Sequence, residues 1–374
     1  MNVVFKKWGL TFALATAALF ATGAVQAADA GKTLNVYNWS DYIAEDTIKN
    51  FEKETGIKVR YDNYDSNEIL HTKLLAGKTG YDIVVPGAHF AKTQIEGGLL
   101  QKLDKTKLSN WSHLDRGLLE QVAKVDPGNQ YLVDWLWGYV AVGINVDKVK
   151  AALGGVPLPE NAWDLLFDPQ YASKLRKCGV SILDSASEVV PVALMYAGRN
   201  PYSHEAADYE AAAKMLKTIR PFVTRFSSSG YIKEMAGGSI CLAMGYSGDL
   251  NIAANRAAAT KGKKPVVIQT LVPKTGSILF FDTMAIPRDA KNVDNAHLFI
   301  NYILRPQVHA ALTNQVFYAN PNAASLKWVN KDVTDNKSVF LEPAAMKSMV
   351  APDALPPATR KLQTRTFTNF KTGR

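Results

Sequence analysis

Residues 33–98 read TLNVYNWSDYIAEDTIKNFEKETGIKVRYDNYDSNEILHTKLLAGKTGYDIVVPGAHFAKTQIEGG, and this stretch decides the fold class. Residues 33–38 alternate apolar and polar side chains, which predicts a strand, and further strands are expected at 58–61 and 81–86. The helices expected between and after them lie at 46–55, at 66–77 and from 87 to Gly97-Gly98. Consecutive strand–helix units are typical of an α/β domain with a largely parallel sheet.

The rest of the chain continues this alternation in a second set of strands and helices. Residues 131–144 form an apolar run without helical periodicity, which we interpret as extended chain that passes between domains. Further strands are expected at 179–183, 240–244, 265–272 and 279–286, and helices at 186–197, 204–219, 250–259, 293–304 and 308–315. The last fifty residues, which contain four prolines, are expected to be irregular. Two α/β lobes with two crossings suggest a cleft, and in such sheets ligands bind outside the carboxyl ends of strands.

The N-terminus predicts secretion. Lys6 and Lys7 precede an uncharged run at 8–25, and Val25-Gln26-Ala27 places small residues at the −3 and −1 positions of a cleavage site. We therefore interpret residues 1–27 as a signal peptide. The alternative is an uncleaved membrane anchor, because the run only just reaches the ~18 residues of a membrane span.

Composition and charge exclude several classes of protein. The 374 residues are 47% hydrophobic and 21% charged, which rules out a disordered chain and a multi-span membrane protein. The formal net charge is +9, but the Lys and Arg residues are scattered, and no block of five or six like charges occurs. We therefore expect a generic basic surface and no nucleic-acid partner.

The chain contains two cysteines, Cys178 and Cys241. In an oxidising compartment two thiols commonly form one bridge, and both cysteines lie in or beside strand-like segments that could be neighbours in a sheet. Two buried free thiols are the alternative. No C-x-x-C motif or paired histidine spacing occurs, so neither a metal nor a cofactor is expected.

Aromatic and acidic residues gather at the ends of the predicted strands. The segments are Trp39-Ser40-Asp41-Tyr42, Asp184 to Glu188, Tyr246 to Asp249, Phe280-Phe281-Asp282 and, after a helix, Phe317-Tyr318. Carboxylates form charge-assisted hydrogen bonds with an ammonium group, and an aromatic face attracts a cation by ~0.5–2 kcal/mol. Each acid taken singly is more typical of a helix cap or a turn. Because four acids coincide at strand ends of both lobes, we predict a site for a linear organic diamine.

Seven segments that span most of the chain occur together, namely Tyr37–Ile43, Gly80–Pro86, Trp137-Gly138, Lys177–Gly179, Gly245–Asp249, Phe281-Asp282 and Phe317–Asn320. With these segments the chain resembles the periplasmic polyamine-binding proteins of bacterial ABC importers, the group that binds putrescine and spermidine. The resemblance implies a type II periplasmic binding protein fold, in which each lobe is a mixed, mostly parallel sheet flanked by helices. The expected lobes are 28–137 with 275–322, and 138–274 with 323–374. It also implies a periplasmic monomer that closes on its ligand and delivers it to an inner-membrane ABC permease.

The resemblance further implies a role for each residue of the site. Trp39 and Tyr246 correspond to opposing aromatic walls, Asp249 and Asp282 to the pair that grips one ammonium, Ser40, Asp41 and Glu188 to the contacts near the other, and Phe280 and Tyr318 to side walls, with Tyr42 beside them. The two cysteines of the family match Cys178 and Cys241, which supports the bridge.

The chain departs from many members of the resembled family at two positions. It has Tyr246 where many have Trp, and Gly87, followed by Ala88 and His89, where many have Ser. Loss of the serine hydroxyl removes a contact worth about 0.5–1.5 kcal/mol and is expected to enlarge the pocket and alter the preference for amine length. For His89 we expect a surface or packing role rather than a ligand contact.

Rival functions remain open at this point. A secreted hydrolase would use Gly245-Tyr-Ser-Gly-Asp249, but Asp249 stands where the G-x-S-x-G motif needs glycine, so no enzymatic activity is expected. Among binding proteins, the alternative ligands are another organic cation, such as agmatine or cadaverine, an amino acid or a ferric complex. An anion is disfavoured, because its site would need Arg or a Gly-rich helix start at the strand ends.

Overall fold

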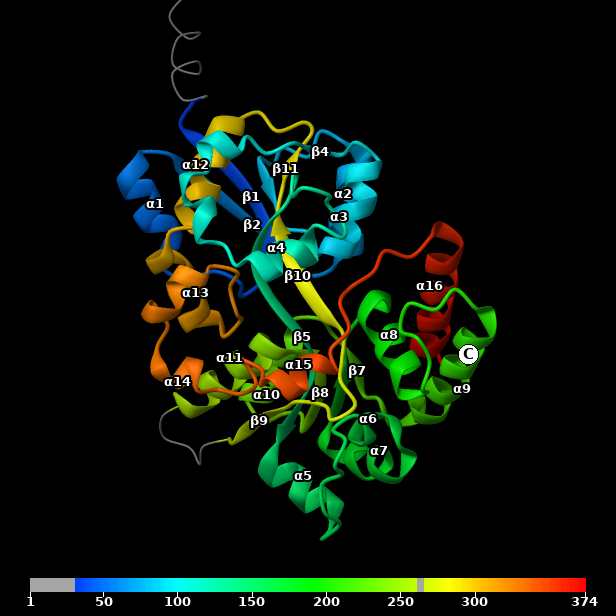
Figure 1. The fold of residues 1–374 in the computed structure, drawn as a ribbon. Coiled ribbons are helices and arrows are strands. Elements are labelled where there is room, and N and C mark those ends of the chain that lie inside the picture. Colours follow the sequence, from blue (N-terminus) through cyan, green and yellow to red (C-terminus); the bar gives the residue numbers. More distant parts are fainter. Residues whose placement is uncertain (1–30, 261–265) are drawn as a thin grey trace, which may run out of the picture.

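The computed structural model describes residues 31–260 and 266–374, so the predicted signal peptide at 1–27 lies outside the described residues. The chain forms two lobes (Figure 1). The upper lobe in the figure contains β1 to β4, and the lower lobe contains β6 to β9 with helices α5 to α11. Long strands connect the lobes, and the candidate site lies where they meet.

A parallel sheet of three strands forms the centre of the upper lobe. In it, β1 (Thr33–Trp39) lies between β2 (Lys58–Tyr64) and β3 (Ile83–Val84). The helices of this lobe are α1 (Thr47–Thr55), α2 (Asn67–Ala76), α3 (Ala88–Glu96), α4 (Arg116–Val122) and α12 (Val293–Ile303), and a separate antiparallel pair joins β4 (Leu100–Gln101) to β11 (Ile286–Pro287). The predicted strand–helix units of residues 33–98 are confirmed, with β2 three residues longer than expected and β3 reduced to two of the six residues expected at 81–86.

The strand β5 (Val133–Asn145) runs from the upper lobe into the lower one (Figure 1). Its first half pairs with β10 (Leu279–Met284), and its second half pairs with β8 (Leu242–Tyr246) and β9 (Ile268–Leu271), all antiparallel. The sheet continues through β6 (Val180–Ile182), which is parallel to both β8 and β7 (Arg225–Phe226). Because every residue of β5 except Trp137 is buried, its sequence is mostly apolar and does not alternate, with Asp134 and Asn145 as its buried polar residues.

Helices enclose the mixed sheet of the lower lobe. They are α5 (Val146–Leu153), α6 (Asp164–Phe167), α7 (Pro169–Leu175), α8 (Ala186–Tyr196), α9 (Ala206–Ile219), α10 (Gly230–Ala236) and α11 (Ser247–Ala258). The chain then passes through α13 (Pro306–Val316), α14 (Lys331–Thr334) and α15 (Pro343–Lys347). No helix in the described part of the chain combines the length and apolarity that crossing a membrane requires.

The C-terminal segment is not irregular, so that prediction was wrong. Residues 357–372 form α16 (Pro357–Thr372), which packs against α8 and α9. The rings of Phe367 and Phe370 lie edge-on to Phe226, at centroid distances of 6.0 and 5.3 Å. Pro357 does not break this helix, because it occupies the first turn, where a missing N–H leaves no intrahelical bond unmade.

Cys178 and Cys241 form a disulfide, as predicted, with their Cα atoms 5.4 Å apart. The two residues precede β6 and β8, which are neighbours in the sheet. The bridge therefore connects two adjacent strands of the lower lobe.

Replacing both cysteines with alanine is expected to lower the free energy of unfolding by about 4 kcal/mol, since the bridge spans 63 residues and constrains the unfolded chain. Denaturant titration of oxidised wild type, reduced wild type and the double variant would measure this. Reduced wild type is the control, and it should match the double variant. Two alkylatable thiols in denatured, unreduced protein would contradict the bridge.

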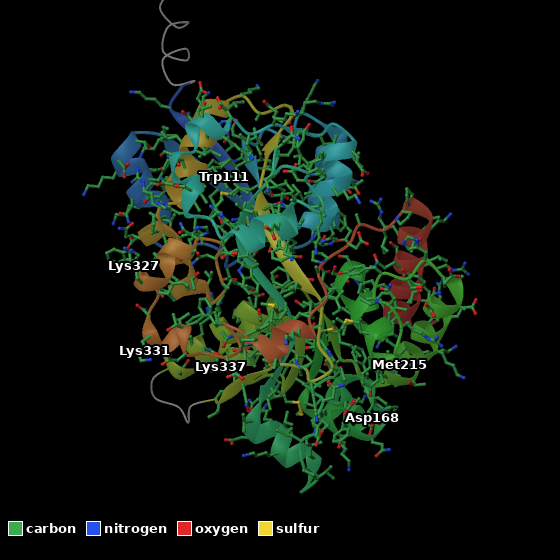
Figure 2. The ribbon with its side chains drawn as sticks, in the orientation of Figure 1. Trp111, Asp168, Met215, Lys327, Lys331 and Lys337 are labelled. Atoms are coloured by element: carbon green, nitrogen blue, oxygen red, sulfur yellow. A yellow bond between two sulfur atoms is a disulfide. The ribbon has the colours of Figure 1, made fainter. Side chains whose placement is uncertain are left out.

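Exposed lysines are spread over the surface rather than joined into a stripe. Figure 2 labels Lys327 beside α13 and Lys331 and Lys337 near α14, and all three are exposed. Lys331 pairs with Asp335 at 2.7 Å, and Lys337 pairs with Glu342 at 3.2 Å. Here the basic side chains are interleaved with acids, which agrees with a generic basic surface.

Candidate ligand-binding site

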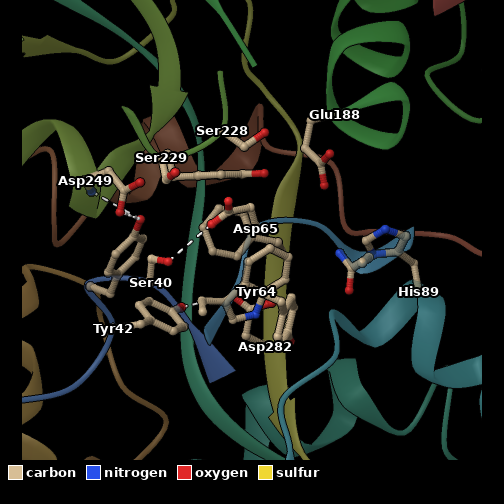
Figure 3. A pocket seen from close by; sticks show the side chains of 15 residues that line it. Ser40, Tyr42, Tyr64, Asp65, His89, Glu188, Ser228, Ser229, Asp249 and Asp282 are labelled. Carbon is tan, nitrogen blue, oxygen red and sulfur yellow. Dashed lines mark hydrogen bonds between the residues drawn. The ribbon is translucent and has the colours of Figure 1, made fainter. Parts of the chain in front are cut away.

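A cavity lies between the lobes, where β1, β2 and β8 reach their carboxyl ends. The empty space within it amounts to about 520 Å³, which includes its open mouth. Nine of the ten predicted site residues line it, namely Trp39, Ser40, Tyr42, Glu188, Tyr246, Asp249, Phe280, Asp282 and Tyr318. The other lining residues are Tyr64, Asp65, Asn67, His89, Ser228 and Ser229. Residues far apart in the chain thus meet in one place (Figure 3).

Aromatic rings from both lobes form the walls. The indole N–H of Trp39 donates to the Val85 carbonyl at 2.9 Å, and this bond holds the ring in place. Tyr64 packs against Trp39 with ring centroids 4.6 Å apart. From the lower lobe, Tyr246 meets Phe280 edge-on at 5.4 Å. Flat apolar faces of this kind suit a methylene chain and attract a cation at its ends.

Two carboxyl groups, those of Asp249 and Asp282, are held by tyrosine hydroxyls. Tyr318 donates to one oxygen of Asp249 at 2.6 Å, and Tyr231 donates to the other at 2.8 Å. Tyr42 donates to Asp282 at 3.0 Å. These bonds fix the direction in which each carboxyl group faces the cavity. Sequence reasoning missed Tyr231, which does not line the cavity and lies on α10, a helix that was not predicted.

The carboxyl groups of the site are strongly perturbed by burial. Burial raises the pKa of Asp249 to about 7, although the tyrosine hydroxyls act in the opposite direction. Burial also raises the pKa of Asp282 well above its usual range. The pKa of Glu188 rises to about 7 through burial and then through the nearby charge of Glu68, against hydrogen bonds from Ser185 and Ser187.

These three acids, Glu188, Asp249 and Asp282, form no ion pair with a Lys, Arg or His side chain of the described residues. Uncompensated buried charge is costly unless a partner of opposite sign is present. The arrangement therefore lacks a cation, and a cationic ligand would supply it. In Figure 3, Asp249 lies on one side of the cavity and Glu188 on the other, so a linear ligand could contact both with its two ends.

A fourth acid, Asp134 on β5, lies near Asp282 and was not predicted. Both of its carboxyl oxygens are buried and have no hydrogen-bond partner in the described structure. Burial and the charge of Asp282 raise its pKa well above the usual range. Its position within the apolar run 131–144 gave no sign of the site, because only the pairing of β5 with β10 places it near Asp282.

Asp41 is the predicted site residue that does not line the cavity. Its backbone has φ of 54°, and its exposed carboxylate pairs with Arg256 of α11 at 2.5 Å. Asp41 therefore joins the upper lobe to the lower one, and the expected contact between its side chain and a ligand amine is absent from this arrangement.

Asp41→Asn is consequently expected to weaken ligand binding less than tenfold, and by the same factor for short and long amines, because an exposed pair is worth ~0.2–1 kcal/mol. Calorimetric titration of two amines of different length would measure the effect. The matched control is the double variant with Arg256→Gln, which should bind no more weakly than Asp41→Asn alone, because the pair is already broken and the positive charge beside Asp249 is removed as well. A loss confined to one amine length would instead indicate direct contact with the ligand.

Gly87 was expected to enlarge the pocket because it lacks a side chain, but neighbouring side chains occupy the space beside it. A Cβ at this position would lie 3.0 Å from the Asn67 side chain and 3.1 Å from the His89 ring. The Gly87 N–H also donates to the side-chain oxygen Oδ1 of Asn67 at 2.8 Å. Asn67 and His89 thus fill the space, and His89 lines the cavity instead of serving only for packing.

Most of the missed lining residues also follow strands. Asp65 comes directly after β2, whose end was placed three residues too early, and Asn67 is the first residue of α2. Ser228 and Ser229 follow β7, a two-residue strand too short to be found by alternation. Within residues 31–260 and 266–374, no group of His, Cys, Asp and Glu is arranged to hold a metal ion.

Residues 46–340 match the family described as bacterial extracellular solute-binding protein. The chain belongs to this family. It is 44% identical to the putrescine-binding periplasmic protein SpuD of Pseudomonas aeruginosa, over 99% of this chain and 100% of that protein. It is also 44% identical to the putrescine-binding periplasmic protein PotF of Escherichia coli, with all of both chains covered. The spermidine/putrescine-binding periplasmic protein of Escherichia coli is 34% identical over 92% of each chain.

Solved structures confirm the predicted fold class. A structure from Listeria monocytogenes superposes with a TM-score of 0.80 at 32% identity and covers 92% of this chain and 100% of its own. The substrate-binding protein PotD of a spermidine/putrescine ABC transporter from Streptococcus pneumoniae gives a TM-score of 0.72 at 26% identity, covering 91% of this chain and 99% of its own.

The relatives of this chain are solute-binding proteins rather than enzymes, so the expectation of a function without catalysis is confirmed.

Proposed function

We propose that this protein is the periplasmic solute-binding component of an ABC importer and that it binds a linear polyamine between its lobes. The observation that carries the proposal is the set of three buried carboxyl groups, Glu188, Asp249 and Asp282, that lack a cationic partner among the described residues. A polyamine supplies the missing charge at both ends of its chain. The named relatives bind putrescine, or spermidine and putrescine, which supports the same ligand class.

In the proposed complex, one ammonium lies between Asp249 and Asp282, and the methylene stem lies between Trp39 and Tyr246. The second ammonium reaches Glu188, directly or through a water molecule. Trp39 belongs to the upper lobe and Tyr246 to the lower one, so a ligand that contacts both favours the closed arrangement of the lobes. The lobe boundaries proposed above, at residues 137–138 and 274–275, would flank the hinge.

The remaining parts of the proposal concern location and partners. Residues 1–27 would act as a cleaved signal peptide, and the mature chain would work as a monomer that docks on an inner-membrane permease. Nucleic acid is not a proposed partner, because the described lysines are paired with acids or scattered.

Calorimetry of the mature protein against putrescine, cadaverine, agmatine, spermidine and matched monoamines tests the proposal. Linear diamines or polyamines should bind much more tightly than monoamines, because only they satisfy acids at both ends of the cavity. Neutral or anionic solutes that bind as tightly as putrescine would overturn the proposed ligand class. Tight binding of agmatine or cadaverine alone would support the proposed cation site but would identify a different amine as the ligand.

A further inference from the structure

A second cavity adjoins the proposed polyamine site. The empty space within it, including its open mouth, amounts to about 790 Å³, and His89 lines both cavities. In Figure 3, His89 lies on the side of the site opposite to Asp249 and near Glu188. An amine anchored at Asp249 that is longer than a diamine therefore extends past Glu188 toward His89 and the second cavity.

Polar atoms without partners face this second cavity. Glu68, His71 and His89 all line it, and the structure gives no hydrogen-bond partner to Glu68 Oε2, His71 Nδ1 or either ring nitrogen of His89. Glu68 lies close enough to raise the pKa of Glu188 by its charge. Glu68 therefore adds a carboxyl group in the second cavity to those of the main site. The polar atoms without partners indicate that part of a ligand can lie there.

The second cavity also holds a positive charge, the Arg360 guanidinium on α16. The described residues give this side chain no ion pair and no hydrogen bond. Burial is the largest cause that lowers the pKa values of His71 and His89, and the charge of Arg360 is the second. The field of Arg360 therefore reaches His89, which lines both cavities. A guanidinium stays charged at every relevant pH. Burial, in contrast, raises the pKa of Glu68 and so disfavours its ionised carboxylate.

We propose that Arg360 is a specificity determinant of the polyamine site: its charge in the second cavity disfavours the third ammonium of a triamine and leaves a diamine nearly unaffected. Glu68 and Asp353 also line this cavity and act in the opposite direction, so Arg360 opposes an attraction that would otherwise favour longer amines. A diamine ends at Glu188 and does not enter the second cavity. This inference rests on the proposed function, since it assumes that the main cavity binds amines.

The test compares putrescine and spermidine by calorimetry on the full mature chain. Arg360→Gln should raise the affinity for spermidine about tenfold and change that for putrescine less than twofold, as expected for removing one partly exposed charge. Glu68→Gln should act with the opposite sign and weaken spermidine more than putrescine. Arg360→Lys keeps the charge and should stay within about threefold of wild type for both amines.

Lys361→Gln is the matched control, because Lys361 is the next residue of α16, is exposed and does not line either cavity. It removes the same charge from the protein and should leave the ratio of the two affinities unchanged. Thermal melting checks that each variant is folded. If Arg360→Gln shifts both amines equally or neither, or if Lys361→Gln shifts the ratio as much, the inference is wrong. Absence of any diamine binding by wild type would instead overturn the proposed function itself.

Discussion

Asp249→Asn is expected to weaken diamine binding by about two to three decades. The side chain is 7% exposed, and both of its oxygens are oriented by tyrosine hydroxyls. Neutralising it leaves a desolvated ammonium partly unpaired, which in buried charge pairs costs about 2–5 kcal/mol, and each 1.4 kcal/mol is about one decade of affinity. Calorimetry at pH 8, where the wild-type carboxyl group is mostly ionised, would measure the difference. Asp282→Asn is expected to have a loss of the same size.

The matched control is Asp65→Asn, which makes the same chemical change in the same cavity. Asp65 is exposed and accepts a hydrogen bond from Ser40 at 3.2 Å, so solvent screens its charge. This variant should lose less than one decade of affinity. Unchanged binding by both Asp249→Asn and Asp282→Asn would show that the ammonium is not held at this end of the cavity.

The sequence predicted those parts of the site that follow from strand ends. Trp39, Tyr246 and Asp249 lie at or just after the ends of β1 and β8, and such ends converge at one edge of an α/β sheet. Asp282 lies within β10, but its pairing with β5 directs it to the same cavity. The alternation of strands and helices over 33–98 therefore led to the fold class and to the residues that the upper lobe contributes after β1, namely Trp39, Ser40 and Tyr42.

What the sequence could not predict depends on contacts between distant segments. Asp134 looked like one polar residue in an apolar run, and no element was predicted around Tyr231. Asp41 followed the strand-end rule, but its positive φ and Arg256 turn it out of the cavity. The helix α16 was missed because the prolines before it and at its start suggested irregular chain, and with it Arg360 and the second cavity were missed as well.

Diamine affinity is expected to rise with pH between 6 and 8 by at least two decades, one for each of Glu188 and Asp249. The pKa values of Glu188 and Asp249 are about 7 in the ligand-free protein, mainly because burial disfavours their charged forms. A bound ammonium favours the charged forms and lowers both pKa values, so binding releases protons. Below about pH 7 each group that must lose its proton reduces affinity by up to one decade per pH unit. The amines stay charged throughout, since their pKa values lie near the ~10.4 of lysine.

Calorimetry at pH 7 in two buffers of different ionisation enthalpy would count the protons released, and Glu188→Gln should remove about one decade of the pH dependence between pH 6 and 8. Glu188 and Asp249 are also expected to make the free energy of unfolding of the ligand-free protein fall with rising pH, whereas they make diamine affinity increase. Because their folded pKa values are raised above those of the unfolded chain, ligand-free protein is expected to lose stability as the pH rises from about 4 to 7. Saturating diamine should reverse that loss, so the increase in melting temperature on adding ligand should grow with pH over the same window. An affinity that stays constant from pH 6 to 8 would show that these carboxyl groups are already ionised without ligand, and that the ligand does not supply the charge that the buried site lacks.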